Sequence, residues 1–146
     1  MLGIVIATHG KFSSGLKDAA EVIMGNTENM VAVSLHAGDP IEELGANIKQ
    51  AILDVNKGQG VVVLVDLVSA SPYNQSVLAI SQLEPELQEN VYIVGGVSLP
   101  VLLETINAQL LNTPIAEAVE AIKEQGRTCV DTWHISDAGD DDDDDF

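Results

Sequence analysis

A chain of 146 residues, 46% of them hydrophobic, is sized for one domain with one core. It has no apolar run near the roughly 20 residues of a membrane helix and no basic flank of a secretory signal, so we expect a cytoplasmic protein without direct membrane insertion. Six basic residues against 23 acidic ones exclude a nucleic-acid footprint, and the single cysteine, Cys129, excludes an internal disulfide and a thiolate metal site.

The first third of the chain reads as strand, helix, strand. Leu2 to Ala7 is almost wholly apolar, as expected of a strand covered on both faces of a parallel sheet. A helix is predicted next, with Ser13 or Ser14 capping its start and Gly25 supplying the left-handed residue at its end. Its apolar residues repeat at helical spacing: Leu16, Ala19, Ala20 and Ile23. Met30 to Leu35 is the second predicted strand.

The second helix is predicted to begin around Asp39 to Glu42 and to close at Gly58. Asp39 is expected to accept an amide hydrogen bond three residues on, in the manner of an N-cap. Gly60 to Asp66 is the third strand, and Ser69 to Pro72 is a turn into a third helix. That helix is expected to turn three residues inward, namely Val77, Leu78 and Ile80.

The last third continues the alternation. Val91 to Val94 is the fourth strand, ending in two glycines, and Ser98 with Pro100 starts a fourth helix. Thr113 and Pro114 start a fifth helix that closes near Gly126 and carries one apolar stripe: Ile115, Ala118, Val119 and Ile122. Thr128 to Ile135 reads as a short fifth strand.

This alternation predicts an α/β fold: a doubly wound, mostly parallel open sheet of about five strands, ordered 2-1-3-4 across the first four, with helices on both faces. We expect residues 1–136 to form this domain. Residues 137–146 are expected to form an acidic, disordered tail, because six consecutive aspartates, Asp140 to Asp145, repel one another and bury nothing. The body is acidic even without the tail, which favours a basic protein partner.

Two predicted strands end in residues suited to chemistry. His9 follows the first strand and Asp66 ends the third, so the two meet at one sheet edge if these strands are parallel neighbours. Ligands of open α/β sheets bind outside the carboxyl ends of the strands. A carboxylate that holds the proton on one imidazole nitrogen leaves the other free as a nucleophile. We therefore predict that Asp66 orients His9 for attack on a phosphoryl group, without metal or cofactor.

At these residues the chain resembles a known family. The segments that carry the likeness are Ile4 to Gly10, Ser14 to Leu16, Val65-Asp66, Ser71 to Asn74 and Gly95 to Pro100. Together they look like the IIA component (EIIA) of the mannose family of the bacterial phosphoenolpyruvate-dependent sugar phosphotransferase system. The resemblance extends from Met1 to about Ile135.

The resemblance implies a phosphoryl carrier. His9 would accept a phosphoryl group from the histidine phosphocarrier protein HPr and pass it to a IIB component, and through it to the IIC/IID membrane permease. It implies that Asp66 is the carboxylate bonded to the histidine and that Ser71 helps to stabilise the phosphate. It also implies a homodimer in which the fifth strand, antiparallel, is exchanged between subunits.

Other function classes share parts of this pattern. The phosphotransfer subunit of a dihydroxyacetone kinase has a similar strand-ending histidine, although Ser71 to Asn74 favours the sugar-transport branch. A flavodoxin-like binding module is a second alternative, against which the scarcity of aromatic residues counts. Histidine phosphatases surround the phosphate with arginines, and Arg127 is the only arginine here. A receiver domain needs an acidic pair where this chain has Thr8 and His9. A purely regulatory interaction domain is also compatible with the sequence.

Two further polar residues lie near the predicted site in the sequence. Lys11 is either a point charge for a phosphate or a solvated side chain, and the second reading is favoured. His36 follows the second strand and is expected to be a loop histidine.

Overall fold

The computed structural model describes residues 1–139 and contains one parallel four-stranded sheet. The strands are β1 (Gly3–His9), β2 (Met30–Leu35), β3 (Val61–Val65) and β4 (Val91–Gly95), in the order β2-β1-β3-β4. The predicted order 2-1-3-4 is confirmed. The central strands β1 and β3 pair in parallel over five residues from Gly3↔Val61 to Ala7↔Val65, so both end at the same edge of the sheet.

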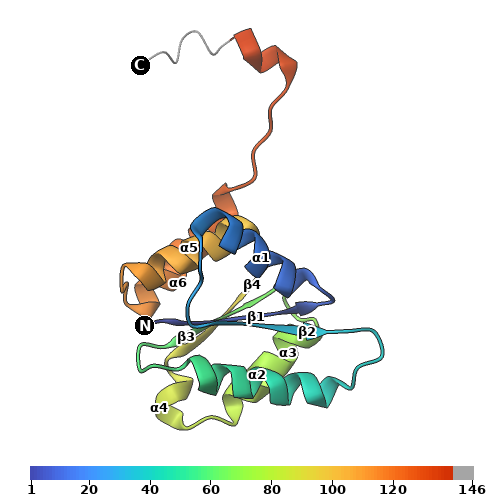
Figure 1. The fold of residues 1–146 in the computed structure, drawn as a ribbon, viewed down its shortest axis with the longest axis vertical. Helices are drawn as coiled ribbons and strands as arrows, with labels where there is room; N and C mark the ends of the chain where they lie inside the picture. Colours follow the sequence, from blue (N-terminus) through green and yellow to red (C-terminus); the bar gives the residue numbers. More distant parts are fainter. Residues whose placement is uncertain (140–146) are drawn as a thin grey trace.

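Helices cover both faces of the sheet, as predicted (Figure 1). On one face lie α1 (Phe12–Met24), α5 (Leu99–Leu110) and α6 (Ile115–Thr128). On the other lie α2 (Ile41–Val55), α3 (Ser71–Ser81) and the short α4 (Pro85–Gln88). Every connection between neighbouring parallel strands therefore passes through a helix. No helix within residues 1–139 is both long and apolar enough to span a bilayer.

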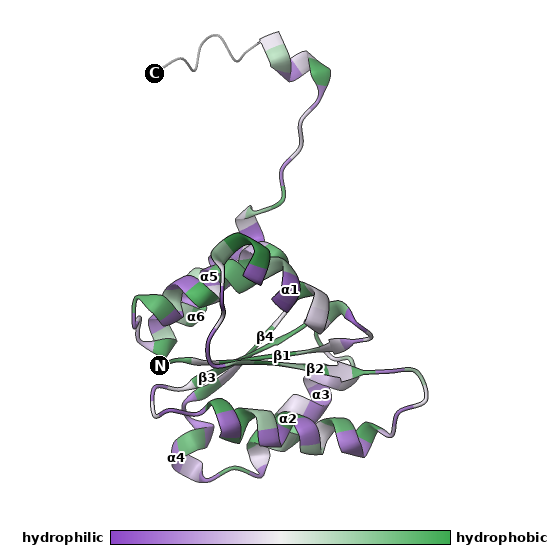
Figure 2. Cartoon of the chain, viewed as in Figure 1, coloured by the Kyte–Doolittle hydropathy of each residue, from purple (hydrophilic) through white to green (hydrophobic). Residues whose placement is uncertain are grey.

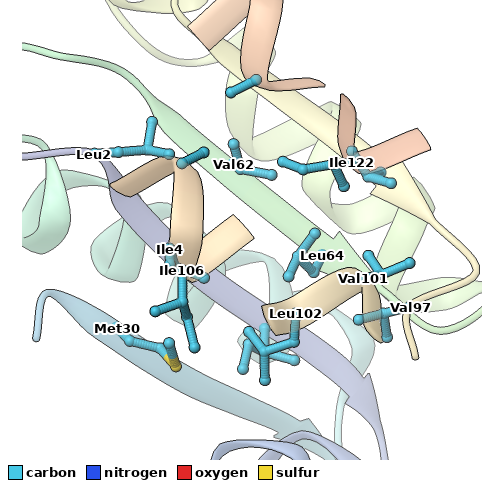
Figure 3. Close-up of a cluster of buried hydrophobic side chains, with 14 of the residues drawn as sticks. Leu2, Ile4, Met30, Val62, Leu64, Val97, Val101, Leu102, Ile106 and Ile122 are labelled. Carbon is cyan, nitrogen blue, oxygen red and sulfur yellow. The ribbon is translucent and has the colours of Figure 1, made fainter. Parts of the chain in front are cut away.

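Apolar side chains form one core layer on each side of the sheet. All five residues of β3 are fully buried, because helices cover this strand on both faces. Figure 3 shows the layer beneath α5 and α6, where Ile4 of β1 and Val62 of β3 meet Leu102 and Ile122. Full burial of a side chain of this size contributes about 1.5–3 kcal/mol. The core therefore fixes the two central strands, whose carboxyl ends carry His9 and Asp66.

The helix starts agree only in part with the sequence. Ser98 does accept a hydrogen bond from the Val101 amide (3.4 Å), and Gly25 ends α1 at φ +83°, as predicted. Neither Ser13 nor Ser14 caps α1. The prediction for Asp39 is also wrong, because its carboxylate accepts the backward hydrogen bond from the His36 amide (2.8 Å). That bond closes the turn before α2, an arrangement typical of short polar side chains in loops.

The predicted inner face of α3 is wrong at two positions. Val77 and Leu78 are exposed, and the residues buried in this helix are small: Pro72, Ser76 and Ala79. Only Ile80 packs partly into the core, as expected. Small residues bring α3 close to its neighbours. On α2, a carbon added at Gly45 would lie 2.5 Å from the Gln75 side-chain oxygen of α3, so the end of that flexible side chain would have to move.

The predicted fifth strand over Thr128 to Ile135 is not seen in the single chain. Thr128 is the last residue of α6, residues 129–134 have no regular structure, and Ile135–Gly139 form a 3₁₀ helix. This segment leads away from the sheet into solvent, and Figure 2 shows apolar residues along it. A strand needs a neighbour for its backbone hydrogen bonds, and the segment has none within the described chain. Residues 140–146 of the predicted tail lie outside the described residues.

Candidate functional site

His9 and Asp66 are in contact at the carboxyl edge of the sheet. The His9 ring nitrogen Nδ1 lies 2.8 Å from Asp66 Oδ2, and the His9 main-chain N–H donates to the same oxygen at 3.0 Å. The other carboxylate oxygen, Oδ1, accepts the N–H of Leu67 at 3.0 Å. One carboxylate thus ties together the last residue of β1 and the loop after β3. Because Nδ1 is engaged, Nε2 is the ring nitrogen left for other chemistry.

The two side chains differ in their exposure to solvent. The His9 side chain is 47% exposed, whereas that of Asp66 is 13% exposed. Burial alone would raise the pKa of Asp66, but hydrogen bonds from the His9 amide and ring, with the charge of that ring, outweigh it and hold the pKa below the ordinary 3.8. Asp66 is therefore a carboxylate at neutral pH. A fixed anion on the Nδ1 side of a solvent-facing imidazole holds the ring proton on Nδ1 and leaves Nε2 as the other ring nitrogen.

Short turns place the pair. Gly10 adopts φ +56°, a conformation that glycine reaches at little cost, and its N–H donates to the Leu35 carbonyl of β2 at 2.8 Å. After β3, Ser69 has φ +67°, and its carbonyl accepts a hydrogen bond from the Asn74 side chain (3.2 Å). Both loops are thereby tied to a strand or helix beside them.

Close packing against β4 supports the loop after Asp66. A β-carbon added at Gly95 would collide with Val68 Cγ2, so glycine allows the loop to approach β4 this closely. The Val97 amide also donates to the Val65 carbonyl at 3.0 Å. The resemblance drew attention to residues 95–100 without saying what they do, and the structure gives Gly95 this packing function.

Ser71, the third predicted site residue, begins α3 and is half-buried. Within residues 1–139 its hydroxyl makes no hydrogen bond with His9 or Asp66. The structure therefore joins His9 to Asp66 and leaves Ser71 at the start of a neighbouring helix. The three residues approach the site from the ends of β1 and β3 and from the first position of α3.

A shallow hollow of about 460 Å³ lies beside His9. It is lined by Gly10, by the loop from Leu35 to Asp39 and by Ile41, so His36 shares this hollow with His9. Four exposed apolar side chains belong to the turns and helix starts around it or around Asp66: Phe12, Ile41, Leu67 and Val68. The sequence analysis missed them, although Leu67 and Val68 are apolar residues directly after a predicted site residue. Such exposed apolar groups are typical of interaction surfaces.

Thr8 was also missed as part of the site. It is a fully buried polar residue in an otherwise apolar strand, and its hydroxyl accepts the Ser13 amide of α1 at 2.7 Å. A hydroxyl directly after a strand predicted to be covered on both faces was the available signal, since buried polar groups need partners. No group of three potential metal-ligating side chains is found within residues 1–139.

Comparison with known proteins identifies the family of the chain. The family model EIIA-man, described as the PTS system fructose IIA component, matches residues 3–123. The fructose-specific EIIA component of Bacillus subtilis is 31% identical over 107 residues, which are 73% of this chain and 70% of that protein. The mannose-specific EIIAB component of Escherichia coli K12 is 30% identical over 126 residues, 86% of this chain. The chain spans only 38% of the length of that second relative.

Among solved structures, the phosphotransferase system component EIIA from Streptococcus agalactiae has the same fold. It superposes with a TM-score of 0.80 over 90% of this chain and 97% of that one, at 20% identity. Together with the parallel sheet, these matches establish that the chain belongs to the mannose-type EIIA family of sugar phosphotransferase system components.

Proposed function

We propose that this chain is the cytoplasmic phosphoryl carrier of a sugar phosphotransferase system, with His9 as the residue that carries the phosphoryl group. The donor is the phosphorylated histidine phosphocarrier protein HPr, and the acceptor is a IIB component, which serves a IIC/IID membrane permease. The observation that carries the proposal is the Asp66 carboxylate, which engages Nδ1 of a half-exposed histidine and leaves Nε2 as the ring nitrogen available to a partner.

The chemistry is an exchange of one P–N bond for another. The lone pair of His9 Nε2 attacks the phosphorus of the donor phosphohistidine, and the P–N bond to the donor breaks as its ring leaves with the electron pair. The proton stays on Nδ1 and remains hydrogen-bonded to Asp66. The negative charge of Asp66 offsets the positive charge that develops on the ring. Transfer to the IIB component follows the same step with His9 as the leaving group. No metal or nucleotide takes part.

Ser71 is proposed to stabilise the phosphoryl oxygens through its hydroxyl. Its place at the first position of α3 supports this role, because unpaired amides and the positive end of the helix dipole lie at that end of a helix. This role is independent of the His9–Asp66 contact, so a Ser71→Ala variant is expected to retain phosphorylation at a reduced rate.

The surface around His9 suits a protein donor. Phe12 and Val68 offer exposed apolar area near the reacting residue, while Glu42 and Glu43 add negative charge at the start of α2. A partner with an apolar patch and a basic rim would complement this surface. Charge complementarity of that kind speeds encounter and weakens as salt is raised.

We propose in addition that two copies of the chain associate through residues 129–139. Val130, Trp133 and Ile135 are 84%, 65% and 69% exposed in the single chain, an unusual solvent exposure for three large apolar residues close together. Covering them with a second copy removes this surface from water. Light scattering on the wild type should give the mass of a dimer, and replacing all three residues by serine should give the mass of a monomer.

The test of the carrier function is intact-mass analysis after incubation with phosphoenolpyruvate, Enzyme I and HPr. The wild type is expected to gain a single phosphate that is lost on acid treatment, and His9→Ala to gain none. His36→Ala is the matched control, because it removes the other histidine of the same hollow. A wild type that stays unphosphorylated, or a His9→Ala variant that is still phosphorylated, would overturn the proposal.

A further inference from the structure

The Thr8 hydroxyl occupies an unusual place, buried beneath the residue proposed to carry the phosphoryl group. Thr8 is fully buried in β1, directly before His9. Its Oγ1 donates to the His9 carbonyl (3.2 Å) and accepts the hydrogen bond of the Ser13 amide (2.7 Å). A hydroxyl has a single hydrogen to donate, and here it is directed to the turn that follows β1, while its lone pair holds the first turn of α1.

A second link joins the same turn to β2. Ser13 is fully buried as well, and its Oγ lies 2.9 Å from the Oγ of Ser34, the residue that pairs with Thr8 in the sheet. The Gly10 amide donates to the Leu35 carbonyl. The segment from His9 to Phe12 is thus held at the His9 carbonyl, at the Gly10 amide and, just beyond it, at the Ser13 amide.

The position of the His9 backbone decides where its ring lies. The main-chain N–H and ring Nδ1 of His9 share one oxygen of Asp66, at 3.0 and 2.8 Å. Two donors from one residue reach one oxygen only when backbone and ring hold a definite relative arrangement. A shift of the His9 peptide therefore lengthens at least one of these bonds and re-aims Nε2.

We propose that Thr8 is a positioning residue for phosphoryl transfer: its buried hydroxyl fixes the β1–α1 turn and so sets the direction of His9 Nε2. This inference rests on the proposed function of His9. Thr8→Val keeps the shape of the side chain and removes the hydroxyl. The buried Ser13 amide then has no partner, and the first turn of α1 has to shift to find one. We expect transfer to slow by roughly 10- to 100-fold, the order of loss caused by an ångström of misplacement.

The chain supplies a matched control. Thr105 is also fully buried and its hydroxyl donates to the Val101 carbonyl within α5 (2.8 Å). Thr105→Val makes the same chemical change at a distance from the sheet edge, and we expect the transfer rate to stay within about twofold of the wild type. Thr8→Ser restores the hydroxyl and should recover most of the rate.

The experiment measures single-turnover phosphoryl transfer from phospho-HPr by rapid quench at saturating donor, with folding checked by circular dichroism. In parallel, ¹⁵N NMR follows hydrogen exchange of the Ser13 amide and the tautomer of the His9 ring. The expected result is slow transfer and fast Ser13 exchange in Thr8→Val, with both recovered in Thr8→Ser. If Thr8→Val does not fold, Thr8→Ala removes the same hydroxyl without placing a methyl group in its position.

The outcomes separate the two proposals. A wild type that accepts phosphate, together with a folded Thr8→Val that transfers at the wild-type rate, would reject the positioning role and leave the carrier function intact. Equal loss in Thr8→Val and Thr105→Val would also reject it, because a general loss of stability would then explain both. A wild type that accepts no phosphate would reject the carrier function itself.

Discussion

The two edges of the sheet handle polar groups in opposite ways. At the amino edge, the buried Gln109 side chain donates to the carbonyls of Leu2 (2.8 Å) and Glu28 (2.9 Å), and Asn29 donates to the Val55 carbonyl (2.8 Å). At the carboxyl edge, Asp66 saturates one side of His9 and leaves the other open to solvent. At the amino edge, the polar side chains hold loops in place through hydrogen bonds. At the carboxyl edge, one nitrogen of His9 is left for a partner molecule.

We expect the largest effect on phosphoryl transfer from a substitution at Asp66, at the carboxyl edge. Asp66→Asn removes the anion that holds the Nδ1 proton, so the rate of phosphoryl transfer should fall by roughly 10²- to 10⁴-fold, in line with other acid–base partners. The assay is transfer from phospho-HPr, with Asp39→Asn as control, since the Asp39 carboxylate accepts the His36 amide beside the same hollow and has no bond to His9. A mild effect of Asp66→Asn on transfer would mean that the carboxylate does not orient the ring.

The amino edge should show the reverse pattern. Gln109→Met keeps the length of the side chain and removes the donor shared by the Leu2 and Glu28 carbonyls, which should lower the free energy of unfolding by about 1–3 kcal/mol. Urea unfolding measures this loss. Gln50→Met, at an exposed position, should be neutral. Transfer by the folded Gln109→Met protein should match the wild type, and a slowed rate would show that the two edges are coupled.

An intermediate case is the contact between β4 and the loop after Asp66. Gly95→Ala places a methyl group against Val68 and should push this loop outward, slowing transfer by about tenfold, equivalent to about 1.4 kcal/mol. Val68→Ala makes room for the methyl group. The double variant should therefore transfer faster than Gly95→Ala alone, and a purely additive result would argue against the proposed contact.

The smallest effect is a pH dependence of stability. The pKa of Asp66 is lowered in the folded state, so this carboxylate adds stability above its ordinary value of 3.8 and loses that contribution as the pH falls through the lower, folded value. Urea unfolding from neutral pH down to about pH 3 should show a steeper decline for the wild type than for Asp66→Asn. Parallel curves for the two proteins would contradict the lowered pKa.

Strand positions and sheet order followed from the sequence because buried parallel strands and amphipathic helices leave strong apolar patterns. The pairing of His9 with Asp66 followed as well, since parallel strands end at one edge. The inner face of α3 did not, because small residues, Ser76 and Ala79, pack there while larger ones point outward. The spacing of apolar residues predicts where large side chains are buried. It does not predict where small residues let two helices pack closely.

The capping of α1 could not be predicted from the sequence pattern either. Ser13 and Ser14 have the residue type of an N-cap, yet the acceptor for the Ser13 amide comes from Thr8 on the preceding strand. Such a bond depends on how strand and helix meet in space. Residues 128–135 were predicted to be a strand, but a strand forms only where a neighbouring edge receives it, and the described single chain does not provide that edge.

The exposed segment after α6 carries the only tryptophan of the chain, Trp133. Trp133 is 65% exposed, and no second tryptophan contributes to the fluorescence of the chain. The emission of the native protein therefore reports on this one segment. A blue shift on concentration would record the covering of Trp133 by another molecule, optically and without a label, while phosphorylation of His9 is followed separately by mass.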